Sequence, residues 1–349
     1  MMTQFDPNAA ASKSSGIFGL PFSAKEAALV LLPVPWDATT SYGGGASHGP
    51  CAIFNASKQI DLFDKELGNF FEAGIFMQDE SQEVRDWNEK ARHAAKKIID
   101  AEILSEEEIQ HTLNKVNTYS KKLNEYVYQQ TKSLLNQGKK VGLVGGDHAT
   151  PLGAIQAHLE KYPDMSMLHI DAHADLRDTF EGFEYSHASI MHNVITKTPL
   201  KQLVQVGIRD FCEEEVHFIE KNSNRITTFF DLDLAEKKLT GESWSNICDE
   251  LIKPLAKEVY ISLDIDGLDP RFCPHTGTPV PGGLDFNEVL FLFKKVIQSG
   301  RKIIGFDVNE VSPGMMYEPS QAIRDAADEW DANVGARLLY KLCGWTIKS

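Results

Sequence analysis

The chain has 349 residues, of which 42% are hydrophobic, 24% charged and 9% aromatic, a composition typical of a globular protein with a large buried core. Its 35 basic and 50 acidic residues give a formal charge of −15, which argues against a nucleic-acid partner because such sites need a basic stripe. No apolar run approaches the roughly 18 residues of a membrane span, and the first residues lack a secretory pattern. We therefore expect a cytoplasmic protein without a membrane partner.

Short β-branched runs recur along the chain and are separated by stretches of helical period. The expected strands are Ala28–Val34, Lys140–Gly145, Met165–Asp171, Leu203–Ile208, Ile226–Phe230, Glu258–Asp264 and Lys302–Val308. Two of the intervening helices are expected at Trp244–Lys257 and Phe286–Gln298. Apolar strands that alternate with helices predict an α/β protein whose mainly parallel sheet is covered on both faces.

One segment interrupts this alternation. From about Glu80 to Lys139 the sequence is rich in Lys, Glu, Gln, Asn and Ala, with apolar residues at helical spacing and no strand pattern. We interpret it as an insertion of two or three helices, one of which opens at Ser105 because Glu106–Glu108 place acidic residues in its first turn. The strands on either side fit one sheet, so we expect a single domain over 1–349 with a helical insertion at about 80–139.

Metal-type ligands stand at the ends of three expected strands, which is where ligands bind in α/β sheets. His148 closes a Gly-Gly-Asp-His motif, in which the two glycines allow a tight turn. At the end of the next strand, a spacing of two in extended backbone places Asp171, His173 and Asp175 on one face. His169 shares this spacing but lies inside the strand, where a supporting or core role fits it better.

A third strand ends in Asp264 and Asp266, two carboxylates on one face that repel each other unless a cation neutralises them. The complete candidate set is His148, Asp171, His173, Asp175, Asp264 and Asp266. Its four carboxylates balance the charge of two divalent ions, so two metal ions fit the set better than one. Oxygen and imidazole ligands without cysteine favour Mn²⁺, with Co²⁺, Ni²⁺ or Fe²⁺ as alternatives.

With these motifs the chain resembles the ureohydrolase family of arginases and agmatinases. Besides Gly-Gly-Asp-His, the matching segments, in the family's order, are Asp171–Asp175, Ser262–Pro270, Thr276–Gly283 and Gly305–Pro313. The resemblance extends from about Pro33 to the carboxyl terminus, without the helical insertion. It implies an arginase-like three-layer α/β/α sandwich around a parallel sheet of about eight strands, usually assembled as a homotrimer or homohexamer.

The resemblance also implies an activity and roles for further residues. Ureohydrolases are binuclear manganese enzymes that cleave a guanidino group to urea and an amine. The six candidate ligands match the family's metal pair, and Asp175 is expected to protonate the departing amine. His187 matches the proton-shuttle histidine, a role that an imidazole near its ordinary pKa suits at neutral pH. Glu310 matches the glutamate that holds the substrate guanidinium, which a carboxylate can pair in a fork.

The sequence favours a guanidine that lacks the α-carboxylate and α-amino groups of arginine. Where arginases carry an asparagine, a serine and an aspartate for these groups, this chain has Arg177, Phe183 and Cys212. We therefore expect agmatine as the substrate, with putrescine and urea as products. If Arg177 pairs with Asp178 or Asp210, the cavity suits a cationic tail, whereas an Arg177 that points into the cavity would bind an acidic one.

Other substrates and other classes of protein stay open. Within the family the alternatives are guanidinobutyrase, guanidine hydrolase, arginase and formiminoglutamase. A non-catalytic binding module would have lost ligands, yet all six are present. A single-zinc, deacetylase-like hydrolase would leave His148 and Asp266 without a common purpose. The sequence thus favours a binuclear-metal amidinohydrolase that acts on a small guanidino compound.

Overall fold

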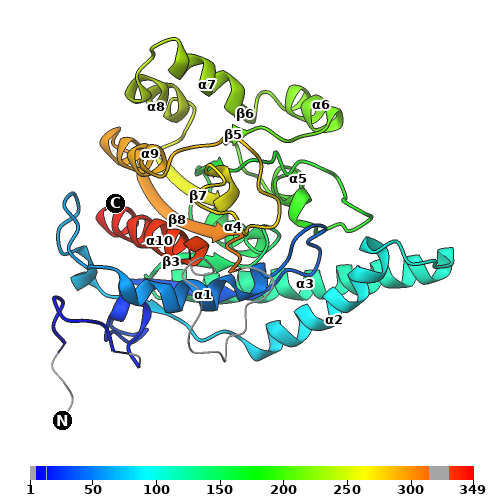
Figure 1. Cartoon of the computed structure of the whole chain (residues 1–349), viewed down its shortest axis with the longest axis horizontal. Helices are drawn as coiled ribbons and strands as arrows, with labels where there is room; N and C mark the ends of the chain where they lie inside the picture. The colour runs from blue at the N-terminus through cyan, green and yellow to red at the C-terminus, as the bar shows by residue number, and fades with distance from the viewer. Residues whose placement is uncertain (1–4, 13, 314–329) are drawn as a thin grey trace.

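Eight parallel strands form one sheet in the computed structural model, which describes residues 5–12, 14–313 and 330–349 (Figure 1). The strands are β1 (Leu29–Val34), β2 (Ile75–Met77), β3 (Lys140–Gly145), β4 (Ser166–Ile170), β5 (Leu203–Ile208), β6 (Ile226–Phe230), β7 (Glu258–Asp264) and β8 (Lys302–Asn309). Their order across the sheet is β2-β1-β3-β8-β7-β4-β5-β6, and each neighbouring pair is parallel. The predicted parallel sheet of about eight strands is confirmed.

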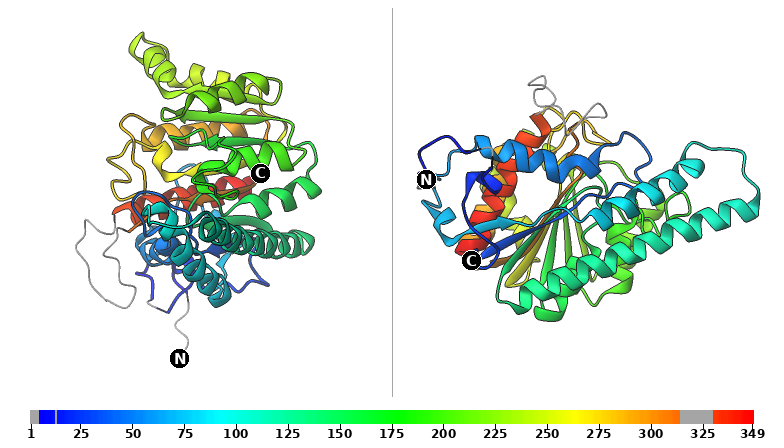
Figure 2. Two further views of the ribbon diagram at one scale, coloured as in Figure 1. Left: turned by 90° about the vertical axis from the view of Figure 1, so that its right-hand side faces the viewer. Right: turned by 90° about the horizontal axis from the view of Figure 1, so that it is seen from below.

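Helices cover both faces of this sheet and complete the three predicted layers (Figure 2). The helices are α1 (Gly49–Ala56), α2 (Gln82–Ile99), α3 (Glu106–Asn136), α4 (Leu152–Lys161), α5 (Ile190–Lys197), α6 (Glu213–Lys221), α7 (Asp231–Leu239), α8 (Trp244–Ile252), α9 (Phe286–Gln298) and α10 (Trp330–Lys348). Apolar side chains of α1, α8, α9 and α10 pack on one face, and those of α3, α4 and α5 pack on the other. Most strand residues are buried, as expected for a sheet that is covered on both sides.

One strand that the sequence pattern did not predict and one helix end differ from the structure for clear physical reasons. The edge strand β2 has only three residues, too few to produce a recognisable strand pattern. The helix expected at Trp244–Lys257 is wrong at its end, because α8 stops at Ile252. Pro254 follows almost at once, and proline lacks the backbone N–H that a continuing helix requires.

The segment at 80–139 contains two helices, α2 and α3, which lie against each other (Figure 2). Their connected ends project beyond the sheet, whereas the last turns of α3 pack on it. Ser105 caps α3 as predicted: its hydroxyl accepts a hydrogen bond from the Glu108 backbone N–H, and the Glu108 side chain accepts one from the Ser105 N–H. None of the helices in the described part of the chain is both long and apolar enough to cross a membrane.

The strand order creates a crevice at the carboxyl edge of the sheet. β3 and β4 follow each other in the chain, yet β8 and β7 lie between them in the sheet. Connections that leave two separated strands in this way open a space above the strand ends, where ligands bind in α/β proteins. All the candidate ligands lie at or just after the carboxyl ends of β3, β4 and β7. These are three of the four central strands, β3, β8, β7 and β4, that border the crevice.

Candidate active site

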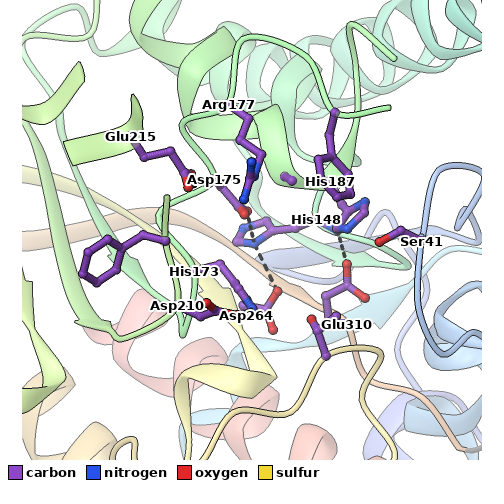
Figure 3. A pocket seen from close by; sticks show the side chains of 14 residues that line it. Ser41, His148, His173, Asp175, Arg177, His187, Asp210, Glu215, Asp264 and Glu310 are labelled. Carbon is purple, nitrogen blue, oxygen red and sulfur yellow. Dashed lines mark hydrogen bonds and ion pairs between the residues drawn. The ribbon is translucent and has the colours of Figure 1, made fainter. Parts of the chain in front are cut away.

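The predicted ligands converge above the ends of the central strands (Figure 3). Nδ1 of His148 lies 3.0 Å from an oxygen of Asp171 and 3.2 Å from an oxygen of Asp264. The Asp175 carboxylate lies 3.4 Å from the same nitrogen. These side chains are almost completely buried, so three strand ends deliver their ligand atoms to one enclosed point.

A second group of ligands adjoins the first. Nδ1 of His173 lies 3.1 Å from Asp266 and 3.5 Å from the other carboxylate oxygen of Asp171. Asp171 therefore belongs to both groups. The ligand atoms of His148, His169, Asp171 and Asp175 are close enough together to hold one metal ion, and those of Asp171, His173 and Asp266 to hold another. Asp264 adjoins the first group through His148. Two adjacent clusters with one shared carboxylate fit a pair of ions, as the sequence predicted.

Hydrogen bonds behind the ligands fix their orientation. The Gln205 amide donates to Ala174 O at 2.7 Å and approaches Nδ1 of His169 at 3.1 Å, which leaves Nε2 of His169 to donate to Asp171 at 2.8 Å. Nε2 of His148 lies 2.8 Å from the Ser262 hydroxyl, so its Nδ1 faces the carboxylates. Such contacts commonly orient metal ligands, but the supporting role expected for His169 stays a prediction, because its ring also lies within the first group of possible ligands.

The charge balance of the site calls for cations. Burial raises the pKa of Asp175 and of Asp264 well above its ordinary value, and neighbouring carboxylates raise both further. Burial and Asp264 also raise the pKa of Glu310. So many buried carboxylates cannot all stay ionised unless positive charge lies among them. Hard oxygen donors mixed with imidazoles fit two divalent ions.

The backbone at these positions differs from the extended conformation that the sequence suggested. β4 ends at Ile170, so Asp171, His173 and Asp175 follow the strand rather than alternate along it. Asp175 has a φ of 55° and Glu310 a φ of 60°, a left-handed backbone conformation that residues other than glycine rarely adopt. Strained backbone of this kind concentrates at functional sites, where the surrounding structure compensates its cost.

Glu310 stands directly beside the ligand groups, immediately after β8. One of its carboxylate oxygens accepts a hydrogen bond from the His148 backbone N–H at 2.8 Å. Its own N–H donates to Gly146 O at 2.7 Å, and its carbonyl accepts from the Thr276 hydroxyl at 2.8 Å. The carboxylate is therefore held rigidly at the floor of the cavity.

His187 lies on the opposite wall, where η5 (His187–Ser189) begins (Figure 3). Its backbone N–H reaches the Thr39 hydroxyl at 3.4 Å, and its ring meets the Phe180 ring edge to face at 5.9 Å. Burial and the positive charge of the His173 imidazole lower its pKa well below the ordinary value that the sequence suggested. At neutral pH the His187 ring is therefore uncharged, which differs from the near-ordinary pKa expected from the sequence.

Arg177 lines the cavity but has a partner other than those expected. Its Nε lies 3.9 Å from Glu215, and its guanidinium lies over the Phe180 ring at 5.1 Å. Of the two arrangements that the sequence left open, the side chain lines the cavity and forms its ion pair with Glu215 rather than with Asp178 or Asp210. Glu215 is itself fixed by the backbone N–H groups of Leu176 and Cys212, both at 2.9 Å. A buried carboxylate thus balances the Arg177 charge at the cavity wall.

The cavity between these walls has a volume of about 160 Å³. Its lining also includes Ser41, Phe180, Asp210, Phe211, Glu215 and Thr278, which sequence reasoning did not assign to the site. For Ser41 a signal existed, because a glycine-rich stretch follows the end of a strand. Glu215 carried none, since it stands in a run of three glutamates that indicates only a helix start.

Two positions that distinguish this chain from arginases have structural roles. Phe183 is completely buried and packs with residues of α2 and α3. Cys212 is the residue before α6, where its N–H binds Glu215. Neither residue offers a charged group to a substrate.

Comparison with known proteins identifies the family. Residues 27–342 match the arginase family. The chain is 34% identical to an N(1)-aminopropylagmatine ureohydrolase of Thermus thermophilus over 294 residues, which are 84% of this chain and 85% of the relative. An agmatinase of Bacillus subtilis is 27% identical over 311 residues, 87% of this chain and 90% of the relative.

A solved structure supports the same fold. The proclavaminate amidino hydrolase of Streptomyces clavuligerus superposes with a TM-score of 0.71 at 22% identity and covers 98% of this chain and 99% of its own. The site and the fold define a hydrolase of the ureohydrolase type, and the chain belongs to the arginase family. The resemblance drawn from the sequence motifs is thereby confirmed, and the deacetylase-like and non-catalytic alternatives lose their support.

Proposed function

We propose that this protein hydrolyses the guanidino group of a small substrate with an agmatine skeleton, releasing urea and an amine. The observation that carries the proposal is the Glu310 carboxylate, held 2.8 Å from the His148 N–H beside two ligand clusters. A guanidinium paired with Glu310 would place its carbon next to those clusters. The cavity of about 160 Å³ is narrow for a ligand site and suits a slender, unbranched guanidine.

Two groups of side chains would hold the metal ions, for which manganese is the first candidate. His148, Asp175 and Asp264 serve one ion, His173 and Asp266 serve the other, and Asp171 serves both. Bound there, two divalent ions would supply Lewis acidity and a hydroxide nucleophile at neutral pH. The protein residues around them then bind the substrate and move protons.

The remaining chemistry can be assigned to three side chains. Glu310 binds and orients the guanidinium through charge-assisted hydrogen bonds. Asp175, whose carboxyl group lies among the ligands, carries the proton that the departing amine requires. His187, which is uncharged at neutral pH, exchanges that proton with solvent.

The tail of the substrate is inferred from the cavity wall. Glu215 lies 3.9 Å from Arg177, so its carboxylate offsets part of the attraction that this arginine would exert on an acidic tail. The side chain of Asp210 at the cavity mouth is 68% exposed and adds negative charge there. Agmatine, with one terminal amine, is the first candidate.

N(1)-aminopropylagmatine is the second candidate, because relatives with 31–34% identity carry that substrate in their names. Its additional amine would reach the cavity mouth, where Asp210 stands. Asp210→Asn should lower kcat/KM for this substrate several-fold more than for agmatine, in line with an exposed ion pair. Equal losses for both substrates would remove Asp210 from tail recognition.

The experiment that tests the proposed reaction is a product assay after metal reconstitution. The protein, dialysed with Mn²⁺, should release urea and putrescine from agmatine in equal amounts. Asp266→Asn should abolish most of this activity, whereas Asp164→Asn, at an exposed surface ion pair, should not change it. Formiminoglutamate with formamide detection completes the assay, and formamide without urea release would replace the proposal by the formiminoglutamase alternative.

A further inference from the structure

The helical insertion holds one wall of the cavity. Residues 37–45, called here the Ser41 loop, follow β1 and carry Ser41 into the cavity lining (Figure 3). The Asn88 side chain of α2 donates to the Asp37 carboxylate at 3.0 Å and accepts a hydrogen bond from the Asp37 backbone N–H at 2.8 Å. This two-point contact joins the start of the Ser41 loop to α2.

Arg92, one helical turn further along α2, binds the middle of the same loop. Its guanidinium donates to the carbonyl oxygen of Thr40 and lies 3.5 Å from that of Ala38. It also lies near Gly44, where an added Cβ atom would reach ordinary contact distance from it, at 3.9 Å. Loop carbonyls have no strand or helix partner, so Arg92 satisfies acceptors that have no other hydrogen bond among the residues the structure describes.

The other side of the Ser41 loop contacts the catalytic wall. The Thr39 hydroxyl accepts the hydrogen bond from the His187 N–H, and Gly44 O accepts one from Ser312 at 2.9 Å. Gly43 has a φ of 66°, and a Cβ atom there would come within 2.8 Å of the Gly277 backbone, so only glycine fits. The loop therefore connects α2 with both His187 and the segment next to Glu310.

We propose that Asn88 and Arg92 are positioning residues, through which the helical insertion holds the Ser41 loop against the substrate and so sets substrate affinity. This inference rests on the proposed function for its kinetic part. The metal-type ligands lie at the end of β7 or just after β3, β4 and β7, outside the Ser41 loop, so loosening the loop leaves metal binding intact. A cavity wall that moves costs binding and orientation, which appear in KM before they appear in metal content.

The test compares Arg92→Met with Arg92→Lys and with a matched control, Lys90→Met, at an exposed position of the same helix. Hydrogen exchange of peptides that cover residues 37–45 is measured on the full chain, together with metal content and urea release. Arg92→Met should exchange faster in this loop and raise KM at least about 10-fold, while kcat changes less than about 3-fold. Arg92→Lys should recover part of the loss, and Lys90→Met should match the unmodified protein.

Asn88→Leu provides a second, independent anchor variant if Arg92→Met folds poorly. Unchanged loop exchange in both anchor variants would overturn the proposal, as would faster exchange with an unchanged KM. A uniform loss of kcat with a lower melting temperature would indicate a merely structural role and would also contradict it. Hydrogen exchange does not require enzymatic turnover. A protein that releases no urea would therefore refute the proposed function, while hydrogen exchange in the Ser41 loop would still decide whether α2 holds this wall of the cavity.

Discussion

The Glu310 carboxylate accepts a hydrogen bond from the backbone N–H of His148, at 2.8 Å, although the two residues are 162 positions apart in the chain. The contact joins the end of β8 to the turn after β3, which are neighbouring strands. It fixes the group proposed to bind guanidinium to the residue proposed to bind metal. The contact thereby holds the guanidinium-binding group and the metal-binding residue in one fixed arrangement.

Glu310→Gln tests this arrangement with little change in shape. The amide can still accept the hydrogen bond from His148 but no longer pairs with a guanidinium. Charge-assisted hydrogen bonds contribute about 1.5–3 kcal/mol, so kcat/KM should fall roughly 10²-fold. Steady-state urea release measures the effect, and retention of full kcat/KM with normal metal content would remove Glu310 from substrate binding.

Metal removal should destabilise the folded protein. Ions that bind only the native state stabilise it by mass action, and their loss leaves buried carboxylates such as Asp264 without compensating charge. Chelation should lower the melting temperature by at least about 5 °C, a shift expected for a few kcal/mol in a chain of this size. Asp164→Asn should show the same metal-dependent shift, whereas Asp264→Asn should show a much smaller one.

His187→Ala should slow urea release by about 10²–10⁴, the usual range for losing an acid–base group. Metal content should not change, because His187 is outside both ligand clusters. Added imidazole should restore part of the rate, since a free ring can carry the same proton. His217→Ala, at an exposed position on α6, serves as the control. Equal rates for His187→Ala and the unmodified protein across neutral pH would exclude the proton-transfer role.

The metal-type ligands could be predicted from the sequence because each stands in a short motif at a strand end. The parallel sheet then places these strand ends at one edge. All six proposed ligands meet there, although they derive from three separate segments of the chain. The strand alternation expected for Asp175 is wrong, because the residue follows the end of β4 and its left-handed backbone directs the side chain to the site.

Other parts of the site depend on contacts between distant segments, which local patterns do not encode. Glu215 became the partner of Arg177 only because the start of α6 packs beside the turn after β4. Arg92 belongs to a helix whose sequence indicates only an amphipathic surface, yet its guanidinium reaches a loop 52 residues earlier. Such partners are decided by tertiary packing, and a single sequence contains no signal for them.

Acid stability should depend on a histidine outside the site. His158 of α4 is completely buried, packs against Gly305, and burial lowers its pKa to about 4. The unfolded chain, with an ordinary pKa near 6.5, binds a proton in this range that the folded protein does not, so stability falls as the pH drops from about 6.5 to 4. The loss should approach 3 kcal/mol.

His158→Phe, which keeps the ring but cannot titrate, isolates this contribution. As the pH falls from 6.5 to 4, the melting temperature of the unmodified protein should fall more than that of the variant. Measuring both proteins in the same metal-free buffer cancels the contribution of the carboxylate cluster. A difference that does not change with pH would contradict a neutral, buried His158.

The most direct measurement of the central claim is kcat/KM for urea release from a panel of agmatine, N(1)-aminopropylagmatine, L-arginine and guanidinobutyrate under one set of conditions. Phe183 is buried and Cys212 directly precedes α6, so neither offers a charged group to an α-carboxylate or an α-amine, and arginine would lose the hydration of both charges without compensation from these positions. We predict that agmatine or its aminopropyl derivative exceeds arginine by at least about 10²-fold. Faster hydrolysis of arginine, or a preference for guanidinobutyrate that Arg177→Ala abolishes, would contradict the account.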